Sequence, residues 1–257
     1  MINWPSNTGL SPSSIESRAA SLEFVFFHVG ENIELPATLV ASIKISNPSA
    51  KIVQLTDLTS PVITAVDTAH RYPVNRDAIM MARAEAYANL APTGALRVFL
   101  DTDMLVVNRI NPNDFDSSKI YLCKRFFEKN NKVNINFRGM GMREYAGKTL
   151  DQAWPYLGCF MAARDNQLLK KIYKLMLELE PKYQVWYGDQ TALRIFAESN
   201  VSSVREVSEF EYAHLFDVDN EGIADHVKRK AIKIIHFKGA RKIFIPEVAI
   251  NQFKGKF

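Results

Sequence analysis

The chain has 257 residues, of which 47% are hydrophobic and 23% charged, enough for the core of one large α/β domain. Its formal net charge of +4 is too weak to indicate a nucleic-acid partner. Residues 1–14 are polar and do not resemble a signal peptide, and no apolar run has the roughly 18 residues of a spanning helix. We therefore expect a cytoplasmic protein.

Helix and strand patterns alternate along the chain. Residues 35–46 carry apolar residues at helical spacing and end before Asn47-Pro48, where proline stops a helix. Residues 76–90 combine Ala, Met and Glu, which favour helices, and end before Pro92 and Gly94. Further helices are predicted at a short segment opening at residues 13–16, at 166–179 and at 189–197. The predicted strands are residues 24–29, 51–56, 61–66, 96–100, 119–124, 157–163 and 232–237.

This alternation predicts a Rossmann-like α/β fold, with a mostly parallel twisted sheet and helices on both faces. We expect a single domain over residues 1–257, with an irregular insertion at about 126–155, where no clean period is present. We expect the tail at 243–257 to dock on the domain; peripheral contact with the inner face of a membrane is the alternative. Cys123 and Cys159, each in an apolar stretch, are expected to be buried free thiols.

Acidic and imidazole side chains follow several of the predicted strands. Ligands of parallel sheets bind beyond the carboxyl ends of the strands, so His28, Asp57 and the Asp101-Thr102-Asp103 turn are expected along one rim.

Asp101 and Asp103 are the first candidate site. Two carboxylates one residue apart at a strand end can hold a divalent ion, and oxygen ligands suit Mg²⁺ or Mn²⁺. Apolar residues on both sides force the pair into a buried turn, which is costly unless a cation or donors compensate the charges. Carboxylates that cap backbone amides are the alternative. For the two other Asp-x-Asp pairs, at 114–116 and 217–219, we expect solvated loops.

His236, Gly239 and Lys242 form the second candidate site. A neutral imidazole can be a metal ligand, although a lone buried histidine is more often a hydrogen-bonded core residue. The glycine lets backbone amides approach a phosphate, and the lysine supplies a point charge for it.

The order of these motifs resembles glycosyltransferase family 8 and its GT-A relatives. That family has an arginine, about seventeen residues and then an apolar strand into an aspartate pair, as in Arg83 to Asp103. Its terminal histidine, glycine and lysine match His236-x-x-Gly239-x-x-Lys242. Residues 186–193, with Asp189-Gln190, look like its aspartate-glutamine segment, and residues 157–161 fall at its donor-sugar strand. The resemblance covers about residues 24–242.

The resemblance implies a GT-A fold and a metal-dependent enzyme that moves a hexose from a nucleotide diphosphate sugar, most naturally UDP-linked, to a saccharide or glycolipid acceptor. Retention of configuration is implied by Gln190; an inverting enzyme would need a carboxylate base, and Asp189 could serve. The alternatives are a nucleotidyltransferase and a non-catalytic nucleotide- or glycan-binding module. The oligomeric state is left open.

The implied roles fall into four groups. Asp101, Asp103 and His236 would ligate Mn²⁺ or Mg²⁺. Gly239 and Lys242 would hold the diphosphate, with Thr102 between the two acidic ligands and Arg83 near the donor sugar and phosphates. Asp189, Gln190 and Gly158 would face the sugar. Phe27, His28 and Val29, at the end of the first strand, would line the base pocket, and Asp57, at the end of the second, is a further candidate binding residue on the same rim.

Overall fold

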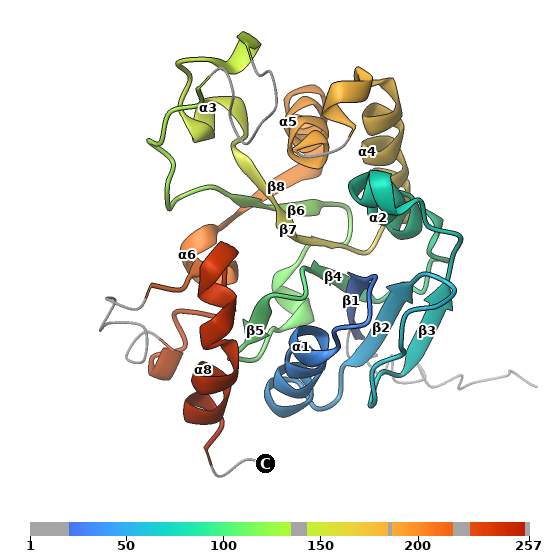
Figure 1. Cartoon of the computed structure of the whole chain (residues 1–257), viewed down its shortest axis with the longest axis vertical. Helices are drawn as coiled ribbons and strands as arrows, with labels where there is room; N and C mark the ends of the chain where they lie inside the picture. Colours follow the sequence, from blue (N-terminus) through green and yellow to red (C-terminus); the bar gives the residue numbers. More distant parts are fainter. Residues whose placement is uncertain (1–20, 135–142, 185–186, 218–226, 255–257) are drawn as a thin grey trace, which may run out of the picture.

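The computed structural model describes residues 21–134, 143–184, 187–217 and 227–254 (Figure 1). A seven-stranded sheet forms its centre, in the order β3-β2-β1-β4-β7-β6-β8. The pairs β1–β2, β1–β4, β2–β3 and β6–β8 are parallel, whereas β7 runs antiparallel to both β4 and β6. The strands are β1 (Leu22–His28), β2 (Lys51–Thr56), β3 (Thr68–Arg71), β4 (Leu96–Leu100), β6 (Ile120–Lys124), β7 (Tyr156–Ala163) and β8 (Val204–Ser208).

Both faces of this sheet are covered by helices, because the core strands are apolar on both sides. Phe24 and Phe26 of β1 pack with Leu39 of α1, whereas Val25 packs on the opposite face with α2, α4 and α5. The predicted α/β fold with a mostly parallel sheet and helices on both faces is thereby confirmed. The helices are α1 (Glu34–Ser46), α2 (Ile79–Asn89), α4 (Asn166–Glu178) and α5 (Gly188–Ser199).

A second, three-stranded sheet lies beside the first, in the order β5-β10-β9. It consists of β5 (Met104–Val106), β9 (His214–Leu215) and β10 (Ile234–His236). The strand predicted at 232–237 is therefore shorter than expected and belongs to this second sheet. Helix α8 (Ile245–Gln252) packs on it through Ile245, Ala249 and the following Phe253, so this part of the tail is docked. The short α6 (Glu209–Tyr212) precedes β9.

The strand predicted at 61–66 is wrong, because the third strand of the sheet is β3 further along the chain. In the segment 61–66, the side chain of Gln54 takes the hydrogen bonds that a neighbouring strand would otherwise form with the backbone. Its Nε2 donates to the carbonyl oxygen of Pro61 (2.8 Å), and its Oε1 accepts from the backbone N–H of Ile63 (2.8 Å). With these backbone groups already bonded, the segment forms a loop, and pairing with β2 begins only at Thr68 opposite Val53.

The irregular segment between β6 and β7 has a small core of its own. Its described part contains an isolated bridge between Lys132 and Thr149 and the short α3 (Leu150–Ala153), which begins with a capping box. Trp154 is fully buried and stacks on Tyr187, with ring centroids 4.4 Å apart. The segment therefore contacts the start of α5.

Several smaller expectations concern the rest of the chain. Cys123 and Cys159 are both buried and free, as predicted. Asp114, at the end of a short 3₁₀ turn, Asp116 and Asp217 are exposed, as expected for solvated acidic pairs. Asp219 and the helix expected near residues 13–16 lie outside the described residues. Among the helices of the described segments, none has the length and apolar character needed to cross a bilayer.

Candidate active site and metal centre

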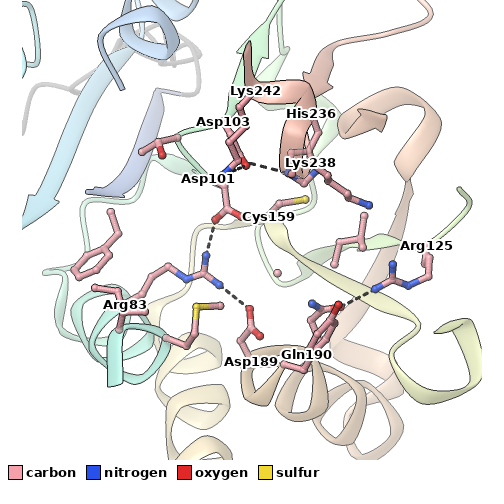
Figure 2. Close-up of a pocket in the computed structure, with 18 of the residues that line it drawn as sticks. Arg83, Asp101, Asp103, Arg125, Cys159, Asp189, Gln190, His236, Lys238 and Lys242 are labelled. Carbon is pink, nitrogen blue, oxygen red and sulfur yellow. Dashed lines mark hydrogen bonds and ion pairs between the residues drawn. The ribbon is translucent and has the colours of Figure 1, made fainter. Parts of the chain in front are cut away.

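A cavity of about 700 Å³ opens at the carboxyl ends of β1, β4 and β6 (Figure 2). Because β7 runs in the opposite direction, its beginning reaches the same edge. The structure brings nearly all of the predicted site residues to this cavity. Those that line it are Phe27, His28, Val29, Arg83, Asp101, Thr102, Asp103, Gly158, Asp189, Gln190, His236, Gly239 and Lys242.

Asp57 is the predicted residue that the structure does not bring to the cavity. Its carboxylate turns into its own loop, where it accepts from the backbone N–H of Ser60 (2.6 Å) and pairs with Arg76 Nη2 (2.6 Å). Asp57 therefore organises the turn after β2. Ser60 in turn accepts from the backbone N–H of Gly30 (2.7 Å), which ties this turn to the one after β1.

Asp101, Asp103 and His236 converge at the end of β4. One ligand atom from each of the three lies within 4.8 Å of the others. The antiparallel pairing of β10 with β5 brings His236 to the two aspartates, because it places His236 opposite Met104, the residue after Asp103. A hydrogen bond from the backbone N–H of Phe237 to the carbonyl oxygen of Asp103 (3.0 Å) fixes the two segments further.

The chemistry of these three side chains fits a divalent cation. Asp103 is 8% exposed, and Lys242 Nζ lies 2.9 Å from its Oδ2. Burial works against its ionisation, but His236 and Lys242 outweigh it and lower the pKa of Asp103 to about 2, so it is a carboxylate at neutral pH. His236 Nε2 lies 3.5 Å from Asp103 Oδ1, and among the described residues His236 Nδ1 is buried without a hydrogen-bond partner. Two carboxylates and an imidazole suit Mn²⁺ or Mg²⁺.

Arg83 joins the metal cluster to the neighbouring part of the cavity. From α2, its Nη1 lies 2.5 Å from Asp101 Oδ1 and its Nη2 lies 2.6 Å from Asp189 Oδ2 (Figure 2). All three side chains are at least two-thirds buried. The positive charge of the guanidinium therefore compensates the two carboxylates, Asp101 and Asp189, which lie close together in a largely buried part of the cavity wall.

Asp189 begins α5 and is pressed against β7. A Cβ atom added to Gly158 would lie 2.0 Å from its Oδ2, a distance that no side chain can accept. Glycine at 158 is thus required for this carboxylate to reach Arg83. The other oxygen, Oδ1, is buried without a hydrogen-bond partner among the described residues, so it is a spare acceptor at the cavity wall.

The turn after β10 carries the remaining predicted phosphate ligands. Gly239 has a φ of +60°, a conformation that favours glycine, and no heavy atom lies within 4 Å of where its Cβ would be. A 3₁₀ helix (Gly239–Phe244) follows and carries Lys242 to the cavity. The backbone of this turn is therefore accessible from the cavity.

The end of β1 supplies a different wall. Phe27, His28 and Val29 line the cavity there together with Ile79 and Met80. Burial lowers the pKa of His28, so its imidazole is neutral at pH 7. Its Nε2 is buried without a hydrogen-bond partner among the described residues. This wall combines apolar surface with a single unsatisfied polar atom.

Arg125 and Lys238 also line the cavity and were not predicted from the sequence. Arg125 directly follows β6, which runs in the same direction as β4 because β7 is antiparallel to both. A basic residue directly after the strand predicted at 119–124 is a signal in the sequence, but it points to the cavity only once the direction of β6 is known. Lys238 precedes Gly239 in the phosphate-suited turn.

The fold and site thus define an α/β protein with a candidate metal centre at the carboxyl edge of its sheet. No protein-family model matches the chain, and no curated protein matches it in sequence.

Proposed function

We propose that the protein is a metal-dependent glycosyltransferase of the GT-A type, which moves a hexose from a nucleotide diphosphate sugar to a saccharide or glycolipid acceptor. One observation supports this above the others. A single cavity joins a cluster of two carboxylates and an imidazole to a lysine, an open glycine turn and an Arg–Asp pair. Those groups match, in order, what a metal, a diphosphate and a sugar require.

In this proposal Asp101, Asp103 and His236 hold Mn²⁺ or Mg²⁺. When bound, the metal neutralises charge that develops on the departing diphosphate. Lys242 adds a point charge at the same place, because its Nζ already lies against Asp103. Gly239 leaves the backbone open for a phosphate oxygen to approach.

The nucleobase would occupy the wall formed by Phe27, His28 and Val29. The neutral imidazole of His28 has a free Nε2 with which to bond a base edge, and the neighbouring apolar side chains suit a flat ring. UDP is the nucleotide we propose, on the strength of the family resemblance alone.

The hexose would lie between Arg83, Asp189 and Gln190. Asp189 Oδ1 is a buried acceptor that a sugar hydroxyl can satisfy, and Arg83 holds the carboxylate in place through Oδ2. Gly158 leaves room where a side chain would intrude. A retaining outcome is part of the proposal and follows from the correspondence of Gln190 with the family's segment.

The test is calorimetric titration of UDP with Mn²⁺ and with EDTA. We expect metal-dependent binding that is lost in Asp103→Asn and His236→Ala and kept in Asp116→Asn, a matched change in an exposed acidic pair. Hydrolysis of UDP-hexoses should show the same pattern. UDP binding that is equal with Mn²⁺ and with EDTA, or no binding in either, contradicts the proposal. Pyrophosphate release from UTP and a sugar phosphate would indicate nucleotidyl transfer instead.

A further inference from the structure

Arg125 lines the cavity beside Gln190, apart from the metal cluster (Figure 2). The residue is only 7% exposed. Its Nε donates to the backbone carbonyl of Trp154 (3.0 Å), and its Nη2 donates to Oε1 of Gln190 (2.7 Å). Both partners are neutral. Among the described residues, no carboxylate forms an ion pair with Arg125.

Two acidic side chains in this part of the structure, Glu209 and Glu128, bind other partners. Glu209 is fully buried; its Oε1 accepts from Lys238 Nζ (2.9 Å), and its Oε2 accepts from the backbone N–H groups of Phe126 and Phe127 (2.7 and 2.8 Å). Glu128 lies 3.8 Å from the same Lys238. Arg125 therefore has no carboxylate in direct contact within the described residues, which is a costly arrangement for a buried charge.

Arg125 also determines the orientation of the Gln190 side-chain amide. A guanidinium has only N–H donors, so the amide atom facing it must be the oxygen. The nitrogen of that amide is then turned away from Arg125 as a donor (Figure 2). Of the five N–H groups of the guanidinium, those on Nη1 bond no described residue.

This end of the cavity wall therefore offers hydrogen-bond donors and a guanidinium that forms no ion pair with a described residue. A negatively charged group that only accepts hydrogen bonds satisfies both the donors and the charge. A planar guanidinium can donate to two oxygens of such a group at once. A neutral hydroxyl would satisfy some of the donors and leave the charge unpaired.

We propose that Arg125, with the amide nitrogen of Gln190, binds an anionic group on the acceptor saccharide, either a carboxylate or a phosphate. That the anion belongs to the acceptor rests on the proposed function, whereas the anion site itself does not. Arg125 is thus a specificity-determining residue that selects an acidic acceptor over a neutral one.

The test uses the full chain in EDTA without nucleotide, so that it is independent of the metal and donor sites. Methyl β-glucuronide, glucose 6-phosphate and neutral methyl β-glucoside are titrated separately by calorimetry. We expect one of the acidic sugars to bind at least about tenfold more tightly than the neutral sugar, as charge-assisted hydrogen bonds require. The tighter acidic sugar identifies carboxylate or phosphate as the recognised group.

Arg125→Met should remove this preference, and Arg125→Lys should weaken it, because a lysine keeps the charge and loses the two-pronged geometry. Arg164→Met is the matched control: Arg164 also forms no ion pair among the described residues, donates to the backbone carbonyls of Gly94 and Pro112, and lies outside the cavity. Thermal unfolding of each variant verifies that it folds. Equal affinity for acidic and neutral sugars, undetectable binding of both acids, or an unchanged preference in folded Arg125→Met overturns the proposal.

If UDP fails to bind but the acidic preference is present, the transferase proposal falls while the anion site stands. If UDP binds with Mn²⁺ and no acidic preference appears, the anion site falls alone. Finally, the acidic sugar should bind as tightly in the presence of UDP and Mn²⁺ as without them. Competition between the two would place the anion on the donor and overturn its assignment to the acceptor.

Discussion

Gly158 and Asp189 approach each other so closely that a methyl group on Gly158 would overlap the carboxylate, at 2.0 Å from Oδ2. The carboxylate cannot simply swing away, because Arg83 holds that same oxygen at 2.6 Å. The beginning of β7 and the first turn of α5 therefore pack directly against one another at the cavity wall.

Gly158→Ala should accordingly displace Asp189 and break its pair with Arg83. We expect a loss of about 1–3 kcal/mol of unfolding free energy, as is typical of an overpacked site, and at least about a hundredfold loss of sugar transfer. Urea unfolding and turnover measure the two effects. In an Asp189→Ala background the same substitution should cost much less stability, since the clashing group is gone. An identical cost in both backgrounds would contradict this account.

Arg83→Gln should leave Asp101 and Asp189 without their shared cation. Breaking such a buried pair typically costs about 3–5 kcal/mol. We expect the loss of unfolding free energy to be smaller in Mn²⁺ than in EDTA, because a bound metal supplies Asp101 with a cation again. Urea unfolding in the two buffers is the measurement. Arg194→Gln, which removes a partly exposed pair with Glu198, should cost about 1 kcal/mol or less in either buffer. Equal stabilisation of wild type and Arg83→Gln by Mn²⁺ would show that Arg83 and the metal do not compensate the same carboxylate, Asp101.

Asp57 should make the stability of the protein fall in acid. Burial raises the pKa of this carboxyl, but hydrogen bonds from Ser60, Arg76 and Thr59 outweigh it and hold the pKa well below 3.8. Because the pKa is depressed in the folded state, the contribution is complete above about pH 4 and is lost as the pH falls further. Asp57→Asn should therefore be less stable than wild type at pH 7, with a difference that shrinks below pH 4.

Urea unfolding between pH 7 and pH 3 measures this difference. Asp114→Asn, at an exposed position, should follow the wild type at every pH. A constant difference between Asp57→Asn and wild type across that range would show that the folded carboxyl has an ordinary pKa.

Cys123 and Cys159 should be inert in the native protein. Burial raises the pKa of both thiols, so neither forms the thiolate that reacts with disulfide reagents. A chromogenic disulfide reagent should detect no thiol in the folded protein and two in urea. Fast reaction of Cys123 under native conditions would mean that its strand opens readily. Fast reaction of Cys159 would mean that the reagent reaches this thiol from the cavity, which Cys159 lines.

Much of the site could be predicted because its residues follow apolar runs. His28 and the Asp101–Asp103 pair lie at strand ends, and a parallel sheet brings such ends to one edge. The same rule led to Asp57, which the structure keeps out of the cavity, because a nearby arginine and its own turn bind the carboxylate. A strand end places a residue at the edge and does not determine where its side chain turns.

The parts that could not be predicted depend on strand order and on side chains that replace backbone partners. Arg125 reaches the cavity because β6 runs in the same direction as β4, on the far side of the antiparallel β7, and no periodicity reveals this strand order or direction. The position of β3 depends on the side chain of Gln54, which bonds the loop before it. Likewise, the three-residue β10 is too short for a pattern to show that it pairs with β5 outside the main sheet.

The pairing of β10 with β5 also bears on how the protein matures. Asp103 is made long before His236, so a chain still emerging from the ribosome carries only the acidic part of the metal cluster. The cation site comes into being when the late segment folds back onto the early one. A metal held only by this closed arrangement would stabilise it by mass action, so divalent ions should raise the fraction of newly made chains that resist a protease.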